Sequence, residues 1–303
     1  GRFAQTIETS PDWCISRNRY WATVMPIWVD SEGNELVVGS IDEIMKYSDQ
    51  VVKEGDKYFF KGKNGNVEFT FHRDICDKVI LKKDGKEYKR IPEVLDCWMD
   101  SGSVPFAEHH YPFDNKERFE KAFPADFIVE YVGQVRAWFN VLFRMSTIIF
   151  DQTPFKNVVC TGVLAGNDGR KMSKTYNNYP DPKTVLETIG GDALRMYMMG
   201  STIMNGGDMD WSDDLLKKQV LLPVYNTLKF FHIYAELHNY EVDQSIVKEN
   251  GNLDLTIKSK NKLDKWIDSR LSQMIYEYES NMLKYDIPAS VKTLQPFVED
   301  LST

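Results

Sequence analysis

The spacing of the hydrophobic positions changes along the chain near residue 92 and again near residue 212. Residues 51–91 contain short runs of β-branched and aromatic residues around the pairs Asn64-Gly65 and Asp84-Gly85. Such pairs favour the tight turns of β-hairpins, because both residue types accept positive φ angles. We therefore predict a small antiparallel β insertion over residues 51–91 and expect it to be accessory rather than catalytic.

From Pro92 onwards the pattern indicates alternating strands and helices. Residues 124–130 and 157–165 are short apolar runs typical of buried strands, and the apolar positions of residues 134–150 recur with helical spacing. A strand, a helix and a strand in this order predict a right-handed βαβ unit of a parallel sheet. This part of the chain is therefore predicted to be α/β.

The remainder of the chain carries helix signals. Asp181-Pro182 predicts a helix start, Gly190-Gly191 predicts a helix stop, and Asp192 is expected to cap the helix that follows. Residues 213–303 have helical periodicity, with a break near Asn250-Gly251. The fold class that follows is α/β up to residue 212 and α-helical over 213–303.

Composition narrows the class of protein. The hydrophobic share is 42% and the charged share 27%, as in a globular protein, and no apolar run reaches the roughly 18 residues of a membrane span. The net charge of −8 argues weakly against bulk nucleic-acid binding, although a local basic face would suffice for a specific partner. The cysteines are scattered without a CxxC pair, so we expect buried or half-buried thiols in a reducing cytosol and no zinc site. They are Cys14, Cys76, Cys97 and Cys160.

Lys171-Met172-Ser173-Lys174 is the most specific candidate for chemistry. A lysine-rich tetrapeptide on a loop is usually a solvated charge run. Here it follows the strand expected at residues 157–165 and a glycine-containing loop. Two lysines on such a loop can close over a triphosphate and stabilise the charge that develops at phosphorus.

Two further segments combine polar and aromatic residues at predicted element ends. Glu130 and Gln134 lie where a strand ends and a helix begins, the edge at which parallel α/β sheets bind ligands. The alternative is a helix cap at Glu130 and a surface amide at Gln134. Trp98 lies among carboxylates and small residues in VLDCWMDSGS, and its alternative interpretation is a core tryptophan at a turn.

Six sequence blocks occur in the order found in isoleucyl-tRNA synthetases, and the chain resembles that family over nearly its whole length. The blocks are DWCISRNRYWA, VLDCWMDSGS, ADFIVE with GQVRAWF, KMSK, NYPDP and GGDALR. The later segments DKWIDSRLSQ and FVEDLS resemble the family's anticodon-binding domain. The resemblance implies that residues 1–212 are the C-terminal half of a Rossmann-like class I catalytic domain, with the β insertion, and that residues 213–303 begin the helical anticodon-binding domain. The family's N-terminal half and editing domain precede residue 1, so we expect a fragment.

The resemblance also implies roles for individual residues. Lys171 to Lys174, with Met172 and Ser173 between them, would be the ATP-binding signature loop, and Lys171 and Lys174 its catalytic residues. The aminoacyl-adenylate would be bound by Glu130, Gly133 and Gln134. Trp98 and Trp138 would wall the pocket for the amino-acid side chain. Compared with the family, the chain has Ala22, Tyr131 and Ala137 in place of glycines, and Gly133 in place of an aspartate.

The activity implied is the joining of L-isoleucine to ATP, giving isoleucyl-adenylate and pyrophosphate, and acyl transfer to tRNA(Ile). Mg²⁺ would accompany ATP, and no protein-bound metal is expected. We expect a cytoplasmic monomer with no membrane partner, and we expect residues 1–303 alone to be inactive. Two alternatives stay open: a valyl- or leucyl-tRNA synthetase, and a catalytically idle fragment that binds tRNA or another partner.

Overall fold

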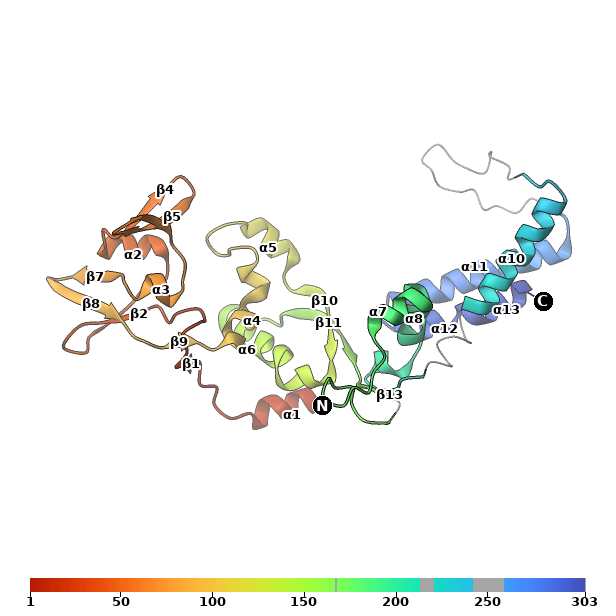
Figure 1. Ribbon diagram of the computed structural model, residues 1–303, viewed down its shortest axis with the longest axis horizontal. Coiled ribbons are helices and arrows are strands. Elements are labelled where there is room, and N and C mark those ends of the chain that lie inside the picture. The colour runs from red at the N-terminus through yellow and green to blue at the C-terminus, as the bar shows by residue number, and fades with distance from the viewer. Residues whose placement is uncertain (167, 213–220, 242–258, 303) are drawn as a thin grey trace. The chain divides into compact units, whose positions relative to one another are not determined.

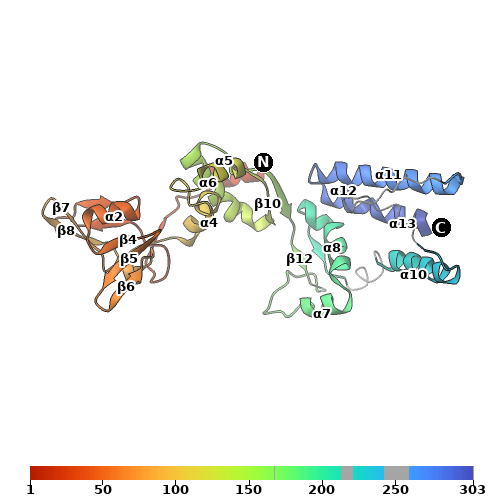
Figure 2. The same cartoon turned by 90° about the horizontal axis from the view of Figure 1, so that it is seen from above.

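The computed structural model describes residues 1–166, 168–212, 221–241 and 259–302, and the chain forms two compact units. Unit 1 comprises Gly1–Asp126 and Gly133–Lys156, and unit 2 comprises Phe127–Val132 and Asn157–Thr303. Figure 1 shows the elements of each unit, and Figure 2 shows them from above.

The β region of unit 1 consists of two antiparallel sheets with the strand orders β3-β2-β8-β7 and β4-β5-β6. Two short helices, α2 and α3, lie in the same region. The elements are β2 (Ile27–Val29), β3 (Glu35–Val37), α2 (Ile41–Tyr47), β4 (Val51–Glu54), β5 (Lys57–Gly62), β6 (Gly65–Glu68), α3 (Arg73–Cys76), β7 (Ile80–Lys83) and β8 (Lys86–Arg90).

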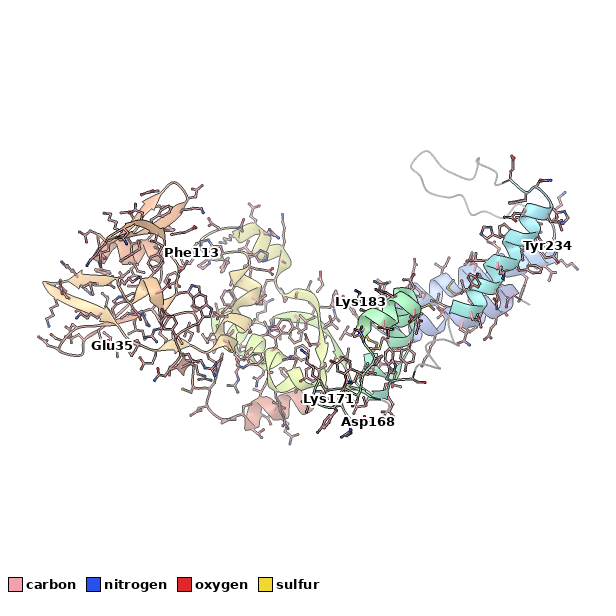
Figure 3. The ribbon with its side chains drawn as sticks, in the orientation of Figure 1. Glu35, Phe113, Asp168, Lys171, Lys183 and Tyr234 are labelled. Carbon is pink, nitrogen blue, oxygen red and sulfur yellow. The ribbon has the colours of Figure 1, made fainter. Side chains whose placement is uncertain are left out.

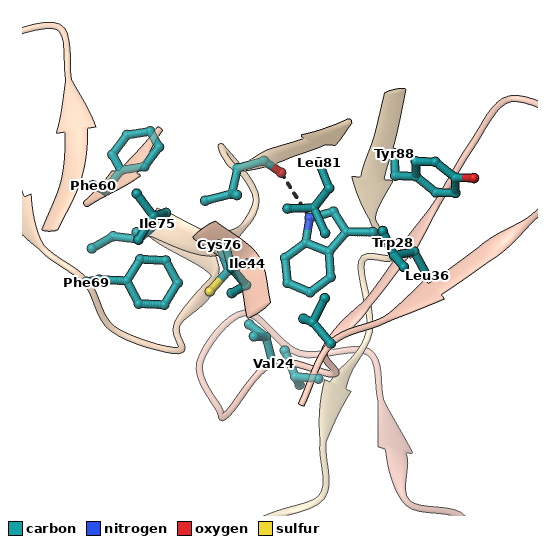
Figure 4. Packing of buried hydrophobic residues seen from close by; sticks show 14 residues of the cluster. Val24, Trp28, Leu36, Ile44, Phe60, Phe69, Ile75, Cys76, Leu81 and Tyr88 are labelled. Carbon is teal, nitrogen blue, oxygen red and sulfur yellow. Dashed lines mark hydrogen bonds between the residues drawn. The ribbon is translucent and has the colours of Figure 1, made fainter. Parts of the chain in front are cut away.

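Trp28 lies at the centre of this region and is fully buried, and its indole nitrogen donates a 3.0 Å hydrogen bond to the carbonyl oxygen of Val79 (Figure 4). The same core contains side chains from Val24 to Val94. The β region is therefore larger than the predicted residues 51–91. The reason is a long-range pairing, because β8 lies beside β2 with Trp28 opposite Arg90.

The two predicted hairpins form. Asp84 and Gly85 make the turn between β7 and β8 with φ angles of +52° and +76°, as their sequence predicts. The other turn lies one residue earlier than predicted, because Gly62 pairs with Gly65 and leaves Lys63-Asn64 between them.

The helical part of unit 1 has elements before and after the β region in the sequence. Its short strands β1 and β9 pair antiparallel. The elements are α1 (Arg2–Thr9), β1 (Ser16–Arg17), β9 (Val94–Leu95), α4 (Cys97–Ala107), α5 (Lys116–Ala122), the 3₁₀ turn η1 (Val132–Arg136) and α6 (Trp138–Phe150).

The predicted strand, helix and strand appear as β10 (Ala125–Tyr131), α6 and β11 (Phe155–Thr161), and β10 pairs with β11. The helix begins at Trp138 rather than at residue 134, because η1 precedes it. The second strand is split, and β12 (Leu164–Ala165) pairs in parallel with β13 (Met209–Asp210). Gly162 lies at the split, where an added Cβ would stand 2.0 Å from the carbonyl oxygen of Gly207.

Unit 2 continues with α7 (Pro182–Thr188), α8 (Gly191–Met199) and the 3₁₀ turn η2 (Thr202–Asn205). Asp181 caps α7 as predicted, and its side chain accepts a hydrogen bond from the Lys183 amide. The predicted cap of the next helix was wrong. Gly190, with a φ of +95°, takes the N-cap position, and Asp192 lies inside the first turn.

The elements that the structure describes after residue 220 are helices, as predicted: α10 (Leu221–Leu237), α11 (Lys262–Met282), α12 (Ile287–Lys292) and α13 (Leu294–Ser302). The predicted boundary at residues 212–213 and the break near Asn250-Gly251 fall at or within segments outside the described residues. Within the described part of the chain, no helix is both long and apolar enough to cross a bilayer.

The cysteine prediction was wrong in part. Cys76 is buried and Cys160 half-buried, but Cys14 and Cys97 are exposed. Burial raises the pKa of the Cys76 thiol to about 12, so this side chain is an inert core residue.

Candidate active site

The residues that follow β12 in unit 2 form a loop, residues 168–178, which we name the lysine loop. Its first half turns back on the strand. Lys171 forms an isolated antiparallel β-bridge with Ala165, and the Gly166 amide donates a 2.8 Å hydrogen bond to the carbonyl oxygen of Arg170. Met172 packs against the buried cluster that contains Val185 and Trp211. The loop is therefore anchored in the core of unit 2 at Met172, the second residue of the lysine tetrapeptide, while the lysines on both sides of it are exposed.

A carboxylate and an amide hold the two ends of the lysine loop together. The Asn178 side chain donates to Asp168 Oδ1 over 2.9 Å, and Asp168 Oδ2 forms an ion pair of 2.7 Å with Arg170. The hydrogen bond from Asn178, together with the backbone amide of Arg170, lowers the pKa of the Asp168 carboxyl to about 2. Asp168 is therefore ionised at neutral pH. Figure 3 labels Asp168 and Lys171 in this loop.

The three cations of the lysine loop differ in their contacts. The Arg170 guanidinium lies 4.3 Å from the centre of the Tyr176 ring, and Lys171 Nζ lies 5.0 Å from the centre of the Tyr131 ring. Lys174 is exposed, and the structure shows its ammonium in no ion pair with a described residue. Lys174 is thus the loop cation that is most available to an anionic ligand.

Glu130 is exposed at the end of β10, in unit 2. One of its carboxylate oxygens, Oε2, accepts a 3.2 Å hydrogen bond from the Tyr131 amide. It does not cap a helix, so the first part of the alternative interpretation from sequence does not hold. A carboxylate in this setting can bind a cationic group such as an ammonium.

In unit 1, Trp98 lies in the first turn of α4 and is 37% exposed. The buried Asp96 caps this helix by accepting a 2.8 Å hydrogen bond from the Trp98 amide, and it pairs with Arg17. Burial raises the pKa of the Asp96 carboxyl, but the Trp98 amide and the Arg17 charge outweigh it and hold the pKa below its ordinary value. Trp98 is therefore a helix residue presented at the surface, and the core-turn alternative does not apply.

The helices α4 and α6 cross where Gly102 lies. A Cβ at Gly102 would stand 2.8 Å from Met145 Cγ and 3.1 Å from the Val141 carbonyl oxygen, so only a glycine allows this approach. Trp138, at the start of α6, donates from its indole nitrogen to the Ser101 carbonyl oxygen over 3.0 Å. Ser101 follows Trp98 by three residues on α4, so this hydrogen bond joins α6 to α4 about one helical turn from Trp98.

Gln134, in η1, is half-buried, and its side chain is bonded to the start of α6. Its Oε1 accepts a 2.9 Å hydrogen bond from the Trp138 amide, which is one of the otherwise unpaired donors at the start of α6. The side-chain amide nitrogen of Gln134 makes no hydrogen bond to another residue that the structure describes, so this donor can serve a ligand. Gly133, its neighbour, is exposed.

The residues singled out from sequence thus fall into two groups. Unit 1 contains Trp98, Gln134 and Trp138, of which Gln134 and Trp138 share a hydrogen bond, whereas Glu130 and the lysine loop lie in unit 2. Sequence reasoning missed Asp168 and Asn178. Their signal was a carboxylate and an amide that flank the lysine tetrapeptide ten residues apart. Among the residues that the structure describes, no group of His, Cys, Asp or Glu side chains is placed to hold a metal ion.

Comparisons with known proteins identify the family of the chain. The family model described as tRNA synthetases class I (I, L, M and V) matches residues 1–212. Proteins named isoleucine–tRNA ligase are 40% identical in Chlamydia trachomatis serovar D and in Protochlamydia amoebophila, and 39% identical in Chlamydia pneumoniae, in each case over 100% of this chain. The chain spans 27% of the length of these curated relatives.

A solved structure has the same fold. It is a leucyl-tRNA synthetase, Agrobacterium radiobacter K84 agnB2 LeuRS in a ternary complex with tRNA and LeuAMS, and it matches with a TM-score of 0.67 at 20% identity. The match covers 96% of this chain and 36% of that one. Since the family model matches well over half of the residues, the chain belongs to the class I tRNA synthetases of the isoleucine, leucine, methionine and valine group.

Proposed function

We propose that this chain is part of an isoleucine–tRNA ligase, which activates L-isoleucine with ATP and transfers it to tRNA(Ile). The observation that carries the proposal is the lysine loop, a shaped and anchored segment that presents Lys171 and Lys174 at the surface of unit 2. The identity with isoleucine–tRNA ligases along the whole chain supports isoleucine as the amino acid. The leucine enzyme with the same fold supports the fold alone.

ATP, accompanied by Mg²⁺ as part of the substrate, would be bound by the lysine loop. Lys171 and Lys174 are the catalytic residues of the proposal, and Met172 and Ser173 hold the backbone between them. Attack of the isoleucine carboxylate at the α-phosphorus increases the charge on the phosphoryl oxygens and on the departing pyrophosphate. The ammonium groups would stabilise that charge, so that positioning and electrostatics, rather than an enzyme nucleophile, lower the barrier.

The amino acid and its adenylate would use the other residues. Glu130 would pair with the substrate ammonium, and Gly133 and Gln134 would contact the adenylate through backbone and side-chain amides. Trp98 and Trp138 would form rigid walls for the branched aliphatic side chain, since broad apolar surfaces fix the shape of such a group.

The domain assignment is part of the same proposal. Residues 1–212 would be the second half of a Rossmann-like catalytic domain, which the extent of the family match supports. Residues 213–303 would begin the helical anticodon-binding domain, which the helices α10 to α13 support. We also propose a cytoplasmic, monomeric enzyme whose macromolecular partner is tRNA(Ile).

The test is amino-acid-dependent exchange of pyrophosphate with ATP by the full-length enzyme that contains this chain. We expect isoleucine to support exchange with a kcat/KM at least tenfold above those for valine and leucine. Preference for valine or leucine would reassign the amino acid, and the absence of exchange with all three would favour the idle tRNA-binding fragment instead.

A further inference from the structure

We propose that Asn178 is a positioning residue that sets the shape of the lysine loop, and that Asp168 is its partner in this role. The expected effect on catalysis rests on the proposed function, whereas the hydrogen bonds that hold the loop are independent of it. Neither residue belongs to the lysine tetrapeptide, and neither is proposed to touch ATP.

The Asn178 side chain joins four loop residues at once. Its Oδ1 accepts from the Ser173 amide over 2.9 Å. Its Nδ2 donates to Asp168 Oδ1 over 2.9 Å, to the Arg170 carbonyl oxygen over 3.1 Å and to the Lys171 carbonyl oxygen over 3.4 Å. A carboxamide suits this place because one end must accept and the other must donate.

These bonds fix the backbone on both sides of Lys171. The amide of Ser173 and the carbonyl oxygens of residues 170 and 171 are held by one planar group, and Asp168 accepts from the same Nδ2 that bonds the two carbonyl oxygens. Ser173 in turn accepts from the Thr175 amide with its hydroxyl, which continues the ordered backbone to the residue after Lys174.

Gly166 lies so close to Asn178 that only a residue without a Cβ fits there. A Cβ on Gly166 would stand 2.1 Å from the Asn178 carbonyl oxygen and 2.8 Å from Nδ2. Met172 packs against the core cluster of unit 2. The backbone that carries the lysines is thus held by both Asn178 and the core before a ligand binds.

A loop that is held in this way before ATP binds should increase the rate of adenylate formation. Charged groups that are already in place stabilise a transition state without the cost of rearranging at the moment of reaction. Because the Asn178 amide is fully engaged with the protein, it acts on ATP only through Lys171 and Lys174. Its loss should therefore lower kcat for adenylate formation and leave the KM for isoleucine unchanged.

The decisive variant is Asn178→Asp in the full-length enzyme. The carboxylate keeps the acceptor for Ser173 but places a second acceptor against Asp168 and two carbonyl oxygens. We expect pyrophosphate exchange to lose about 10- to 100-fold in kcat, with the KM for isoleucine within about twofold of wild type. We also expect faster limited trypsin cleavage after Arg170, Lys171 and Lys174, measured without substrate.

The matched control is Asn177→Asp. Asn177 is the exposed neighbour, its φ of +46° suits either residue, and the structure shows no side-chain hydrogen bond from it to another described residue. We expect wild-type kinetics and wild-type cleavage. The double variant Asp168→Asn with Asn178→Asp exchanges carboxylate and amide, restores the bond between the two side chains, and should recover part of both losses.

Lys174→Ala separates this proposal from the proposed function. If Asn178→Asp changes neither kcat nor cleavage beyond the Asn177→Asp control, the positioning role is overturned. If cleavage accelerates and kcat is unchanged while Lys174→Ala lowers kcat, the catalytic part of the positioning role is overturned and the lysine function stands. If Lys174→Ala leaves kcat unchanged, the function proposed for the loop fails, and the cleavage rates alone decide whether Asn178 holds it.

Discussion

The indole nitrogen of Trp138 donates a 3.0 Å hydrogen bond to the carbonyl oxygen of Ser101, so the first turn of α6 is tied to α4 one helical turn beyond Trp98. The bond fixes the orientation of a large aromatic ring that is only half-buried. A ring that is fixed in this way can act as a wall that distinguishes side chains by their size.

Replacing Trp138 with phenylalanine tests this wall. Phenylalanine has a smaller ring and no donor for Ser101, so we expect the KM for isoleucine to rise about three- to tenfold, equivalent to about 0.7–1.4 kcal/mol. The ratio of kcat/KM for isoleucine over valine should fall, and the KM for ATP should hardly change. Trp28→Phe is the control, because it also removes an indole hydrogen bond but lies in the β-region core. Equal effects on isoleucine and ATP would remove the pocket assignment.

Lys174→Ala in the full-length enzyme should lower kcat for adenylate formation by about two to three powers of ten, or about 3–4 kcal/mol, because a cation that meets developing charge is lost. The KM for isoleucine should stay near its wild-type value. Lys183→Ala is the matched control, since Lys183 is an exposed lysine of α7 that pairs only with Glu187 one turn away among the described residues. Stopped-flow or pyrophosphate-exchange kinetics measure the difference. If the two variants behave alike, Lys174 is a solvated surface charge.

Gly102→Ala should destabilise unit 1, because the added methyl group meets Met145 and the Val141 carbonyl oxygen at the crossing of α4 and α6. Overpacking of this kind lowers the free energy of unfolding by about 1–3 kcal/mol, and the higher helix propensity of alanine offsets up to about 1 kcal/mol of this loss. We expect a net loss of about 1–2 kcal/mol in denaturant unfolding. Gly191→Ala in α8 meets the end of the flexible Arg195 side chain instead and should be neutral or stabilising. A stable Gly102→Ala variant would show that the crossing is looser than described.

Acid should weaken the β region through Asp30. Its carboxylate accepts from the Asn34 side chain and from the backbone amides of Glu32 and Asn34, and these bonds lower its pKa from 3.8 to about 2. The unfolded chain therefore binds a proton before the folded chain does, and stability should fall as the pH decreases from about 4 to about 2. Asp30→Asn should be less stable at pH 7 and lose less between pH 4 and pH 2. Thermal unfolding measured across this pH range tests the assignment. The same dependence of the unfolding temperature on pH in both proteins would contradict it.

The sequence was informative where a signal is local. Asp84-Gly85 determines its own turn because both residues accept positive φ angles, and Asp181-Pro182 starts α7 because an acceptor and a fixed φ are what a helix N-terminus needs. Such features depend on neighbours within a few residues. The same locality explains why the order of β10, α6 and β11 could be predicted.

Long-range contacts could not be predicted in this way. Nothing near Arg90 indicates that β8 pairs with β2, so the β region was placed at residues 51–91 although Phe60 and Leu81 share a core with Trp28. In the candidate site, the lysine tetrapeptide could be recognised from the sequence. The hydrogen bonds of Asn178 to it depend on a loop whose ends, ten residues apart, come together, and hydrophobic periodicity does not indicate that such ends meet.

The position of Met172 should make movements of the lysine loop detectable by tryptophan fluorescence. It packs against the cluster that includes Trp211, a tryptophan only 7% exposed, while the lysines on either side of it face solvent. Indole emission depends on the polarity and the quenching groups around the ring, and Met172 packs against the cluster to which this ring belongs. Any movement of the loop that shifts Met172 should therefore alter the emission of Trp211, so that nucleotide titrations could be followed by intrinsic fluorescence with no label attached to the chain.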